Sequence, residues 1–409
     1  MIAEVIYQGN SINGEINLPA SKSISNRVLI VHALGNLNAP IHNLSDADDT
    51  QQLIKALSNQ STDIDAGDGG TTLRFLMACY CAIGAEVLLT ASEQMKKRPI
   101  KPLVDSLLEL GADITYTEIE GKLPVQIRNS KLKSKHLLMD GEISSQFISA
   151  LMLIGPLVPG GLTIEITGEM VSQPYIHMTS AVMKHFGADV KVKGNLVRIA
   201  EGKYVDREFT IEPDWSAASY WYEIAALSNS SEIFLPGLTK NSLQGDSAIV
   251  RIMKMFGVET EFHTNGVHLI KQELMIPEYF SDDFTNCPDL GPAVAATCAG
   301  INITADLHGL KNFRLKESDR AAALQRELYN MNVKTDFCGG SKFKLYHGSG
   351  LRIYNKPINT YHDHRIAMAF APLALKTGKV LIDNYDVVKK SYPKFYEDLM
   401  QVGFEVKFD

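Results

Sequence analysis

The sequence predicts a two-domain α/β protein built from six copies of one supersecondary unit. A chain of 409 residues exceeds the roughly 250 to 300 residues at which single hydrophobic cores stop growing. An amphipathic helix that ends at glycine or asparagine and leads directly into an alternating strand recurs along this chain. Hydrophobic residues make up 45% and charged residues 21%, so each domain has enough apolar side chains for a substantial core.

The helix, cap and strand pattern is clear in five segments and degenerate in a sixth. Apolar residues keep helical spacing up to each cap and then alternate with polar residues. Two or three copies would be ordinary in an α/β protein, but the caps recur every 70 to 76 residues, which favours three units in each domain. The clear copies are 103–116, 181–192, 250–262, 324–337 and 396–408, with caps at Gly111, Gly187, Gly257, Asn332 and Gly403, and the degenerate copy is 53–64.

Two proline-containing stretches mark the expected crossings between the domains. They are 19–21 and 212–214. With both as crossings, residues 1–18 pack with 214–409 in a discontinuous domain, and residues 19–213 form the other domain, whose first unit is shortened. A pair of linkers permits hinge closure, so we expect the active site in the cleft between the domains.

Composition excludes several classes of partner. The chain has 40 Lys plus Arg against 47 Asp plus Glu, a formal charge of −7, which argues against binding to nucleic acid or to an anionic membrane. No apolar run approaches a membrane span and the first residues do not resemble a signal peptide, so we expect a cytoplasmic protein. The five cysteines are scattered and predict neither a disulfide framework nor a zinc site.

Two segments in the first third pair a helix start with groups suited to anions. Lys22, Ser23 and Arg27 place two cations and a hydroxyl at a helix N-terminus, where phosphate or carboxylate binds readily. A capped helix with solvated charges explains this segment equally well. The glycines in 66–74 allow a close backbone approach, but the lysine of a P-loop is missing and a tight turn is the simpler interpretation.

Two polar runs, 141–146 and 171–175, precede apolar helical stretches. Their serine and glutamine side chains either cap the helices or donate to the hydroxyl and phosphate groups of a ligand. Capping is the simpler interpretation of each run taken alone.

Charge is concentrated in two segments of the last third. Helical spacing would place Lys316, Glu317 and Arg320 near one another. A solvated charged face is the ordinary explanation, although a carboxylate between two cations also suits proton transfer beside a bound anion. His364 and Arg365 open an apolar helix, and they indicate an anion and proton-handling pair rather than a metal site.

Taken together and in this order, the segments resemble the EPSP synthase family of enolpyruvyl transferases. The resemblance spans nearly the whole chain, and it is specific because nine motifs follow the family's order. They are SKSISNR (21–27), GDGGTTLR (67–74), RPIKPL (98–103), SSQF (144–147), VSQPYI (171–176), NSLQGD (241–246), RLKESDR (314–320), YHDHRIAMAF (361–370) and KSYP (390–393).

The resemblance implies a two-domain inside-out α/β barrel with three βαβαββ repeats per domain, the helices inside and the sheets outside. It implies transfer of the enolpyruvyl group of phosphoenolpyruvate to the 5-hydroxyl of shikimate 3-phosphate, through a tetrahedral intermediate that loses phosphate, in the shikimate pathway of aromatic amino-acid biosynthesis. These two small molecules are the implied partners. No metal or organic cofactor is implied, and we expect a monomer.

The resemblance also assigns residues. The implied contacts of shikimate 3-phosphate are Lys22, Ser23, Arg27, Ser144, Ser145, Gln146, Ser172, Asp289, Asn312 and Lys316. The implied contacts of phosphoenolpyruvate are Lys22, Gly70, Arg98, Gln146, Arg320, Arg365 and Lys390. Asp289 matches the base for the hydroxyl, while Lys22 and Glu317 match the groups that handle the proton at C3, with His364 in support.

The sequence departs from the family pattern at two positions, and two rival readings remain. Asp68 stands where asparagine is usual, and we expect it to cap the following helix rather than to pair with an arginine. Phe75 stands where proline often follows the arginine. The sister transferase acting on UDP-N-acetylglucosamine resembles the chain less, because it lacks the SSQF segment. A non-catalytic anion-binding protein is disfavoured because the acid and base candidates are all present.

Overall fold

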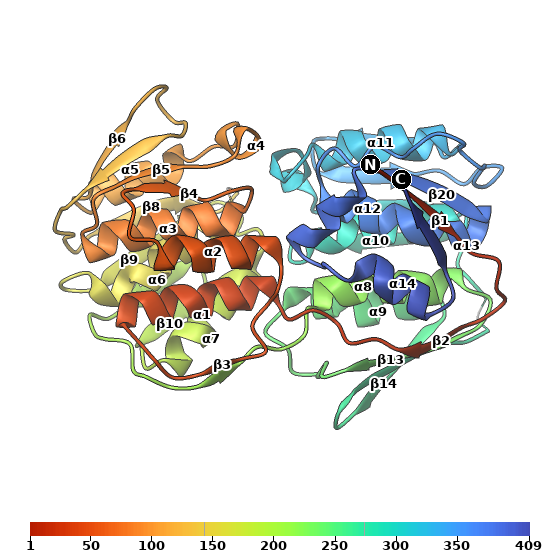
Figure 1. The fold of residues 1–409 in the computed structure, drawn as a ribbon, viewed down its shortest axis with the longest axis horizontal. Coiled ribbons are helices and arrows are strands. Elements are labelled where there is room, and N and C mark those ends of the chain that lie inside the picture. The colour runs from red at the N-terminus through yellow and green to blue at the C-terminus, as the bar shows by residue number, and fades with distance from the viewer. Residues whose placement is uncertain (143, 274) are drawn as a thin grey trace. The chain divides into compact units, whose positions relative to one another are not determined.

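The computed structural model describes residues 1–142, 144–273 and 275–409, which form two compact units of an α/β fold (Figure 1). Unit 1 comprises Met1–Pro19 and Pro213–Asp409, and unit 2 comprises Ala20–Glu212. At the crossings, the Asp214 amide donates to the Pro19 carbonyl and the Ser21 amide donates to the Glu212 carbonyl, each at 2.9 Å.

Unit 2 alternates helices with short strands. Its sheets have the strand orders β4-β5-β7-β6, β10-β11-β9-β8 and β12-β3. In chain order its elements are α1 (Lys22–Gly35), β3 (Ile41–His42), α2 (Asp48–Ser58), β4 (Asp63–Asp65), α3 (Gly70–Ile83), β5 (Val87–Thr90), α4 (Glu93–Lys96), α5 (Lys101–Glu109), β6 (Asp113–Tyr116), β7 (Val125–Arg128), β8 (His136–Asp140), α6 (Ser145–Ile154), η1 (Gly155–Leu157), β9 (Leu162–Thr167), α7 (Gln173–His185), β10 (Val190–Lys193), β11 (Leu196–Ile199) and β12 (Phe209–Thr210).

Unit 1 begins with two N-terminal strands and continues after the second crossing. Its sheets have the orders β20-β1-β21, β14-β15-β13-β2 and β16-β17-β19-β18. Its elements are β1 (Ile2–Ile6), β2 (Ile12–Glu15), α8 (Trp215–Leu227), β13 (Ser231–Pro236), η2 (Gly245–Ala248), α9 (Ile249–Lys254), β14 (Val258–His263), β15 (Gly266–Lys271), β16 (Tyr279–Asp283), η3 (Pro288–Leu290), α10 (Gly291–Gly300), β17 (Thr304–His308), η4 (Lys311–Leu315), α11 (Arg320–Asn330), β18 (Thr335–Cys338), β19 (Lys342–Leu345), α12 (His364–Phe370), η5 (Ala371–Leu373), α13 (Ala374–Thr377), β20 (Lys379–Asp383), η6 (Tyr385–Lys390), α14 (Phe395–Gln401) and β21 (Glu405–Phe408).

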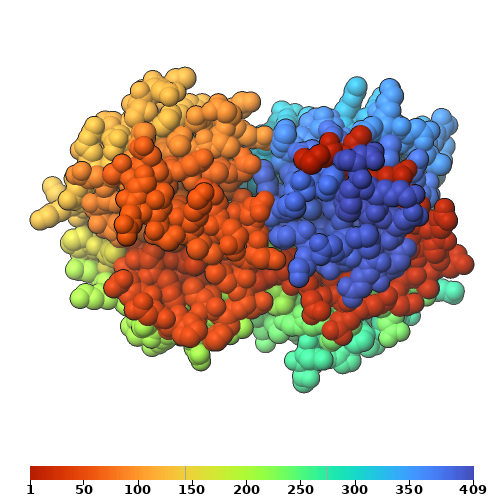
Figure 2. Space-filling view, viewed as in Figure 1, coloured from red at the N-terminus to blue at the C-terminus, as the bar shows by residue number. Residues whose placement is uncertain are grey.

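One strand pattern recurs in the four-stranded sheets. A parallel pair, such as β4 with β5 or β16 with β17, is extended by two antiparallel strands. The N-terminal residues complete two sheets of unit 1, because β1 lies antiparallel between β20 and β21 and β2 pairs with β13 in parallel. Figure 2 shows the red N-terminal atoms set among the blue C-terminal atoms of this unit. The two ends of the chain therefore pair within unit 1, the unit to which the chain returns at the second crossing.

The five predicted caps are confirmed. Each lies between its helix and the strand that follows, and each has a positive φ: 94° at Gly111, 87° at Gly187, 79° at Gly257, 72° at Asn332 and 97° at Gly403. Glycine and asparagine reach this left-handed conformation with little steric cost, which ends the helix and starts the strand within a few residues.

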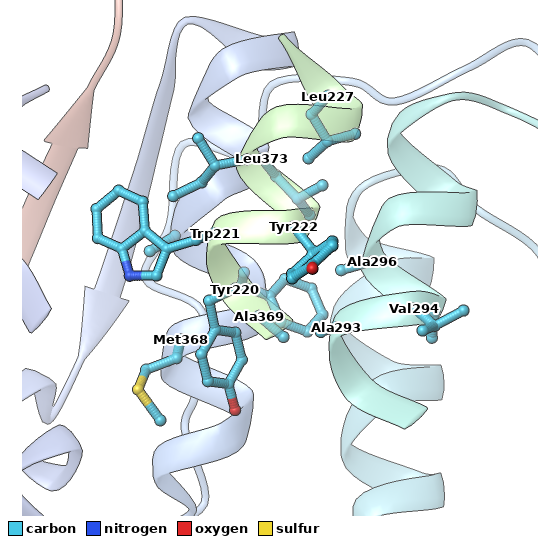
Figure 3. Close-up of a cluster of buried hydrophobic side chains, with 14 of the residues drawn as sticks. Tyr220, Trp221, Tyr222, Leu227, Ala293, Val294, Ala296, Met368, Ala369 and Leu373 are labelled. Atoms are coloured by element: carbon cyan, nitrogen blue, oxygen red, sulfur yellow. The ribbon is translucent and has the colours of Figure 1, made fainter. Parts of the chain in front are cut away.

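The central helices carry the cores. In unit 1, helices α8, α10 and α12 pack together, and every residue of α12 is buried. Figure 3 shows Tyr222 of α8 beside Ala296 of α10, where a small side chain lets the helices approach closely, while Trp221 lies on the other side of α8. Strands β8 and β9 instead alternate buried and more exposed residues, so one face of that sheet lies against the core. Within the part of the chain that the structure describes, no helix is long and apolar enough to cross a membrane.

The core of unit 1 contains an isolated carboxyl group. Glu223 of α8 is fully buried, and neither of its side-chain oxygens has a hydrogen-bond partner among the described residues. Burial raises the pKa of Glu223 well above its ordinary value, because the charged form loses its water of solvation without a compensating partner.

Glu223→Gln should stabilise the protein at alkaline pH and have little effect near pH 4. The folded-state pKa of Glu223 lies above its unfolded value, so wild-type stability is lost as pH rises between the two values, by up to about 1.4 kcal/mol per pH unit. The free energy of unfolding in urea, measured from pH 4.5 to 8.5, should diverge in favour of the variant. The exposed substitution Glu278→Gln is the control, and an equal gain at every pH would contradict the assignment.

Candidate functional site

In unit 2, Arg27 is a buried cation held by neutral acceptors. Its Nε donates to the Thr179 hydroxyl at 2.7 Å, Nη1 to the Ser23 carbonyl at 2.7 Å and Nη2 to the Ser149 hydroxyl at 3.2 Å. No carboxylate pairs with Arg27 among the residues that the structure describes, and burial lowers its pKa to about 10. A guanidinium in this environment is prepared to bind an anion.

The unusual Phe75 contributes to this cation site. Its fully buried ring lies 5.3 Å from the Arg27 guanidinium, and the Tyr175 ring lies 5.8 Å from the same group. Aromatic faces attract a cation without neutralising it. Phe75 therefore supports Arg27 from α3 instead of merely filling the core.

Lys22 is the first residue of α1. Its Nζ lies 2.8 Å from Oδ2 of Asp49, a partner on α2 that sequence reasoning missed. The Asp49 carbonyl also accepts a hydrogen bond from the Thr72 hydroxyl at 2.8 Å. Asp49 thus links the start of α1 to the first turn of α3.

Gly70, Arg98 and Gln146 converge at the N-terminus of α3. A Cβ on Gly70 would lie 2.8 Å from Nη1 of Arg98 and 3.0 Å from Oε1 of Gln146, so any larger residue would push these side-chain ends from their present positions. Arg74, absent from the predicted contacts, donates to Oε1 of Gln146 at 2.7 Å. Its i,i+4 spacing from Gly70 was the signal that could have identified it. Together these groups surround the amide end of a helix of 14 residues, which suits an anion.

The predicted serines have different local roles. Ser144 is the N-cap of α6, and its hydroxyl accepts from the Gln146 amide at 3.4 Å, while Ser145 is buried in the first turn. Ser172 is buried at the N-cap of α7 with φ of 58°, a left-handed conformation that costs a non-glycine residue free energy. Ile143, inside the polar run 141–146, lies outside the described residues.

Asp68 lies just before α3 and is exposed. Its Oδ1 accepts a hydrogen bond from the hydroxyl of Ser92, which is the N-cap of α4. The N-cap of α3 is Gly69. Asp68 is thereby connected to the segment that leads to Arg98.

In unit 1, Asp289 of η3 is surrounded by three cations. Arg320 Nη1 lies 2.8 Å and Lys316 Nζ 3.3 Å from Oδ1, and Arg365 Nη2 lies 3.0 Å from Oδ2. Burial alone would raise the pKa of Asp289, but Arg365, Lys316 and Arg320 hold it well below its usual range. Asp289 is therefore ionised at neutral pH.

Arg320 is the centre of this network. Its guanidinium also lies 2.6 Å from Glu317 Oε2 and 2.8 Å from the fully buried Asp363 Oδ2. Burial alone would lower the pKa of Arg320, yet the Asp363, Glu317 and Asp289 carboxylates raise it above its ordinary value. One cation thus satisfies three carboxylates.

The helical arrangement expected for Lys316, Glu317 and Arg320 is wrong in part. Asp319 caps α11 by accepting from the Ala322 amide at 3.0 Å, so the helix begins only at Arg320. Lys316 is extended at the end of η4 and pairs with Asp289. Glu317 still contacts Arg320, because the loop before the cap brings it back.

Two further polar residues continue the network. Arg365 Nη2 donates to the Ser216 hydroxyl at 3.3 Å, and that hydroxyl is hydrogen-bonded to the Asp246 carboxyl group. Burial and the nearby Asp289 carboxylate raise the pKa of Asp246 to about 6. Asp246 ends the NSLQGD motif, but its role in supporting Arg365 was not foreseen, because Ser216 is needed to connect them.

A strained turn leads into α12. Tyr361 and His362 have φ of 53° and 57°, which costs free energy at residues with side chains. The Tyr361 hydroxyl donates to the buried Glu327 at 2.7 Å, and the His362 carbonyl accepts from Lys390 Nζ at 3.3 Å. The first contact fixes the turn that places Asp363, and the second holds Lys390 to that turn.

The remaining predicted residues of unit 1 lie around this network. His364 is buried as the first residue of α12, with Nδ1 4.0 Å from Asp363 Oδ1. Asn312 is half-buried in η4, the element that ends beside Lys316.

The predicted residues therefore form two groups, one in each unit. Group 2, in unit 2, contains Lys22, Ser23, Arg27, Gly70, Arg98, Ser144, Ser145, Gln146 and Ser172, all at the starts of helices or the turns before them except Arg27, which lies in the second turn of α1. Group 1, in unit 1, contains Asp289, Asn312, Lys316, Glu317, Arg320, His364, Arg365 and Lys390.

Comparisons with known proteins point to one family. The family model described as EPSP synthase (3-phosphoshikimate 1-carboxyvinyltransferase) matches residues 6–64 and 58–399. The chain is 41% identical over 406 residues to the 3-phosphoshikimate 1-carboxyvinyltransferase of Bacteroides fragilis, covering 97% of each chain. It is 33% identical over 438 residues to the Haemophilus influenzae protein of the same name, covering 96% of this chain and 97% of that protein. The EPSP synthase structure from Acinetobacter baumannii has the same fold, with a TM-score of 0.78 at 22% identity over 100% of both chains.

Arg320→Met should destabilise unit 1 by about 3 to 5 kcal/mol, because it leaves the fully buried Asp363 carboxylate without its cation. Urea unfolding at pH 7 would measure the loss. The deficit should shrink as pH falls, since the depressed pKa of Asp289 contributes wild-type stability that acid removes. Arg326→Met, at an exposed position of the same helix, should cost less than about 0.5 kcal/mol, and equal losses in the two variants would contradict the network.

Proposed function

The chain belongs to the EPSP synthase family, and we propose that it transfers the enolpyruvyl group of phosphoenolpyruvate to the 5-hydroxyl of shikimate 3-phosphate, releasing phosphate. The observation that carries the proposal is the Asp289 network, where an ionised carboxylate is surrounded by three cations. The reaction needs both features: a base for the attacking hydroxyl and positive charge for two polyanions.

The proposal assigns both groups to one reaction. Shikimate 3-phosphate would be bound by Lys22, Ser23, Arg27, Ser144, Ser145, Gln146, Ser172, Asp289, Asn312 and Lys316. Phosphoenolpyruvate would be bound by Lys22, Gly70, Arg98, Gln146, Arg320, Arg365 and Lys390. We further infer that each unit is one half of an inside-out α/β barrel and that the two units close on the substrates, which would exclude water and fix the reacting atoms.

In the proposed mechanism, Asp289 accepts the proton of the 5-hydroxyl group of shikimate 3-phosphate while the oxygen of that hydroxyl bonds to C2 of phosphoenolpyruvate. A proton reaches C3 at the same time, from Lys22 or Glu317, with His364 in support. The same group then takes a proton back from C3 of the tetrahedral intermediate as the C2–O bond to phosphate breaks, which leaves the enolpyruvyl ether and phosphate. The buried cations stabilise the charge that develops on the carboxylate and phosphate.

Phosphate release tests the function directly. The protein should release phosphate only when phosphoenolpyruvate and shikimate 3-phosphate are both present, and mass spectrometry should find the enolpyruvyl ether of the acceptor. UDP-N-acetylglucosamine in place of shikimate 3-phosphate should give no product. Phosphate release with UDP-N-acetylglucosamine but not with shikimate 3-phosphate as the acceptor would assign the chain to the sister activity. No phosphate release with either acceptor would favour a binding protein.

Asp289→Asn should lower kcat by roughly 100-fold while the KM for shikimate 3-phosphate stays within a few-fold, because an amide cannot accept the hydroxyl proton. Steady-state assays well below the melting temperature would measure both constants. Asp319→Asn removes the same charge from a nearby helix cap that asparagine also serves, so its kcat should be unchanged. An Asp289→Asn enzyme with normal turnover would remove Asp289 from the mechanism.

A further inference from the structure

The hydroxyl of Tyr220 is a buried polar group without a well-formed hydrogen bond. Tyr220 of α8 is 1% exposed, and its hydroxyl makes no hydrogen bond of good geometry to any residue that the structure describes. Two other buried tyrosines of unit 1 are satisfied: the Tyr222 hydroxyl lies 3.0 Å from the Thr260 hydroxyl, and the Tyr392 hydroxyl donates to Asp398 at 2.7 Å. An unpaired buried hydroxyl is costly, and phenylalanine would fill the same space without that cost.

The hydroxyl points toward group 1. In Figure 3 the Tyr220 ring lies beside Met368, and its oxygen is directed away from Leu227, the last residue of α8. Helical side chains lean toward the N-terminus of their helix and residues four apart share one face. Tyr220 therefore lies over Ser216, whose hydroxyl accepts from Arg365.

Electrostatics identifies the same neighbour. Burial raises the pKa of Tyr220. The charges of Arg365 and Arg320 oppose this rise, and so does a weak hydrogen bond from the Arg365 guanidinium. Arg365 thus already lies near the phenolic oxygen, although its well-formed hydrogen bonds go to other acceptors. Arg365 donates to Asp289 Oδ2 at 3.0 Å, to the Asp289 carbonyl at 3.4 Å and to Ser216 at 3.3 Å.

We propose that Tyr220 is a positioning residue for Arg365: its oxygen accepts a hydrogen bond when Arg365 turns from Asp289 to a bound carboxylate or phosphate. This proposal rests on the proposed function. A guanidinium that grips an anion with two parallel N–H groups still has three donors to satisfy in a buried site. Tyr220 provides the acceptor that Asp289 gives up, and this explains why a tyrosine occupies the position.

Tyr220→Phe tests the proposal by deleting one oxygen. The KM for phosphoenolpyruvate should rise roughly tenfold, as expected for loss of one hydrogen bond to a charged group, while kcat changes less than about threefold. The urea midpoint without substrates should stay the same or increase, because an unpaired hydroxyl has been removed. Tyr222→Phe is the matched control and should show the opposite pattern, with a lower midpoint and an unchanged KM.

A double-mutant cycle separates positioning of Arg365 from direct contact with the substrate. Tyr220→Phe should raise the KM of the Arg365→Lys variant by less than about a further twofold. Lysine lacks the planar guanidinium group whose N–H donors need the Tyr220 oxygen as an acceptor. An unchanged KM in Tyr220→Phe, or equal KM effects in both Arg365 backgrounds, would overturn the proposal. A wild-type enzyme that releases no phosphate would overturn the proposed function instead, and binding of phosphoenolpyruvate to both proteins, measured by calorimetry, would then decide the role of Tyr220.

Discussion

The structure of the unit 1 site depends on one buried guanidinium. Arg320 contacts Asp289 of η3, Glu317 before α11 and Asp363 before α12, so three segments of distant sequence are fixed by a single side chain. A pair of this kind contributes little net stability compared with apolar packing, but removing one member leaves an uncompensated buried charge. The network therefore serves mainly to position Arg320 and its three carboxylates, and it adds little net stability to the fold. Lysine could not replace Arg320, since it lacks the planar fork that reaches three acceptors.

The strained turn before α12 extends the same logic. Two consecutive left-handed residues persist only where their surroundings determine them, and here Glu327 holds Tyr361 while Asn384 contacts the His362 ring at 3.0 Å. The next residue, Asp363, then caps α12 through the Arg365 amide and pairs with Arg320. Backbone strain thus places one carboxylate that orients both arginines.

Sequence reasoning succeeded where the determinants are local. The caps at Gly111, Gly187 and Gly403 follow from residue type and periodicity. The Glu317 contact with Arg320 was predicted from helical spacing, but it forms because the loop before the Asp319 cap brings Glu317 back. It failed where a contact depends on tertiary packing: Asp49 reaches Lys22 from 27 residues away, and Gln146 reaches Arg74 from 72 residues away. No periodicity encodes such pairs, because they arise only after the helices pack. The start of α11 was missed because Asp319 competes as a cap with the charge pattern before it.

Arg27 of group 2 and the two arginines of group 1 are held differently, and this difference bears on the chemistry. Arg27 is held by hydroxyl and carbonyl groups, so an arriving anion meets a positive charge that is not neutralised and recovers the cost of burying it. Arg320 and Arg365 are instead neutralised by carboxylates. An anion that takes either arginine removes a cation from Asp289, and the lost attraction raises the pKa of that carboxylate. Under the proposed function, Asp289 gains basicity when phosphoenolpyruvate binds, so binding of one substrate and activation of the other become one electrostatic event.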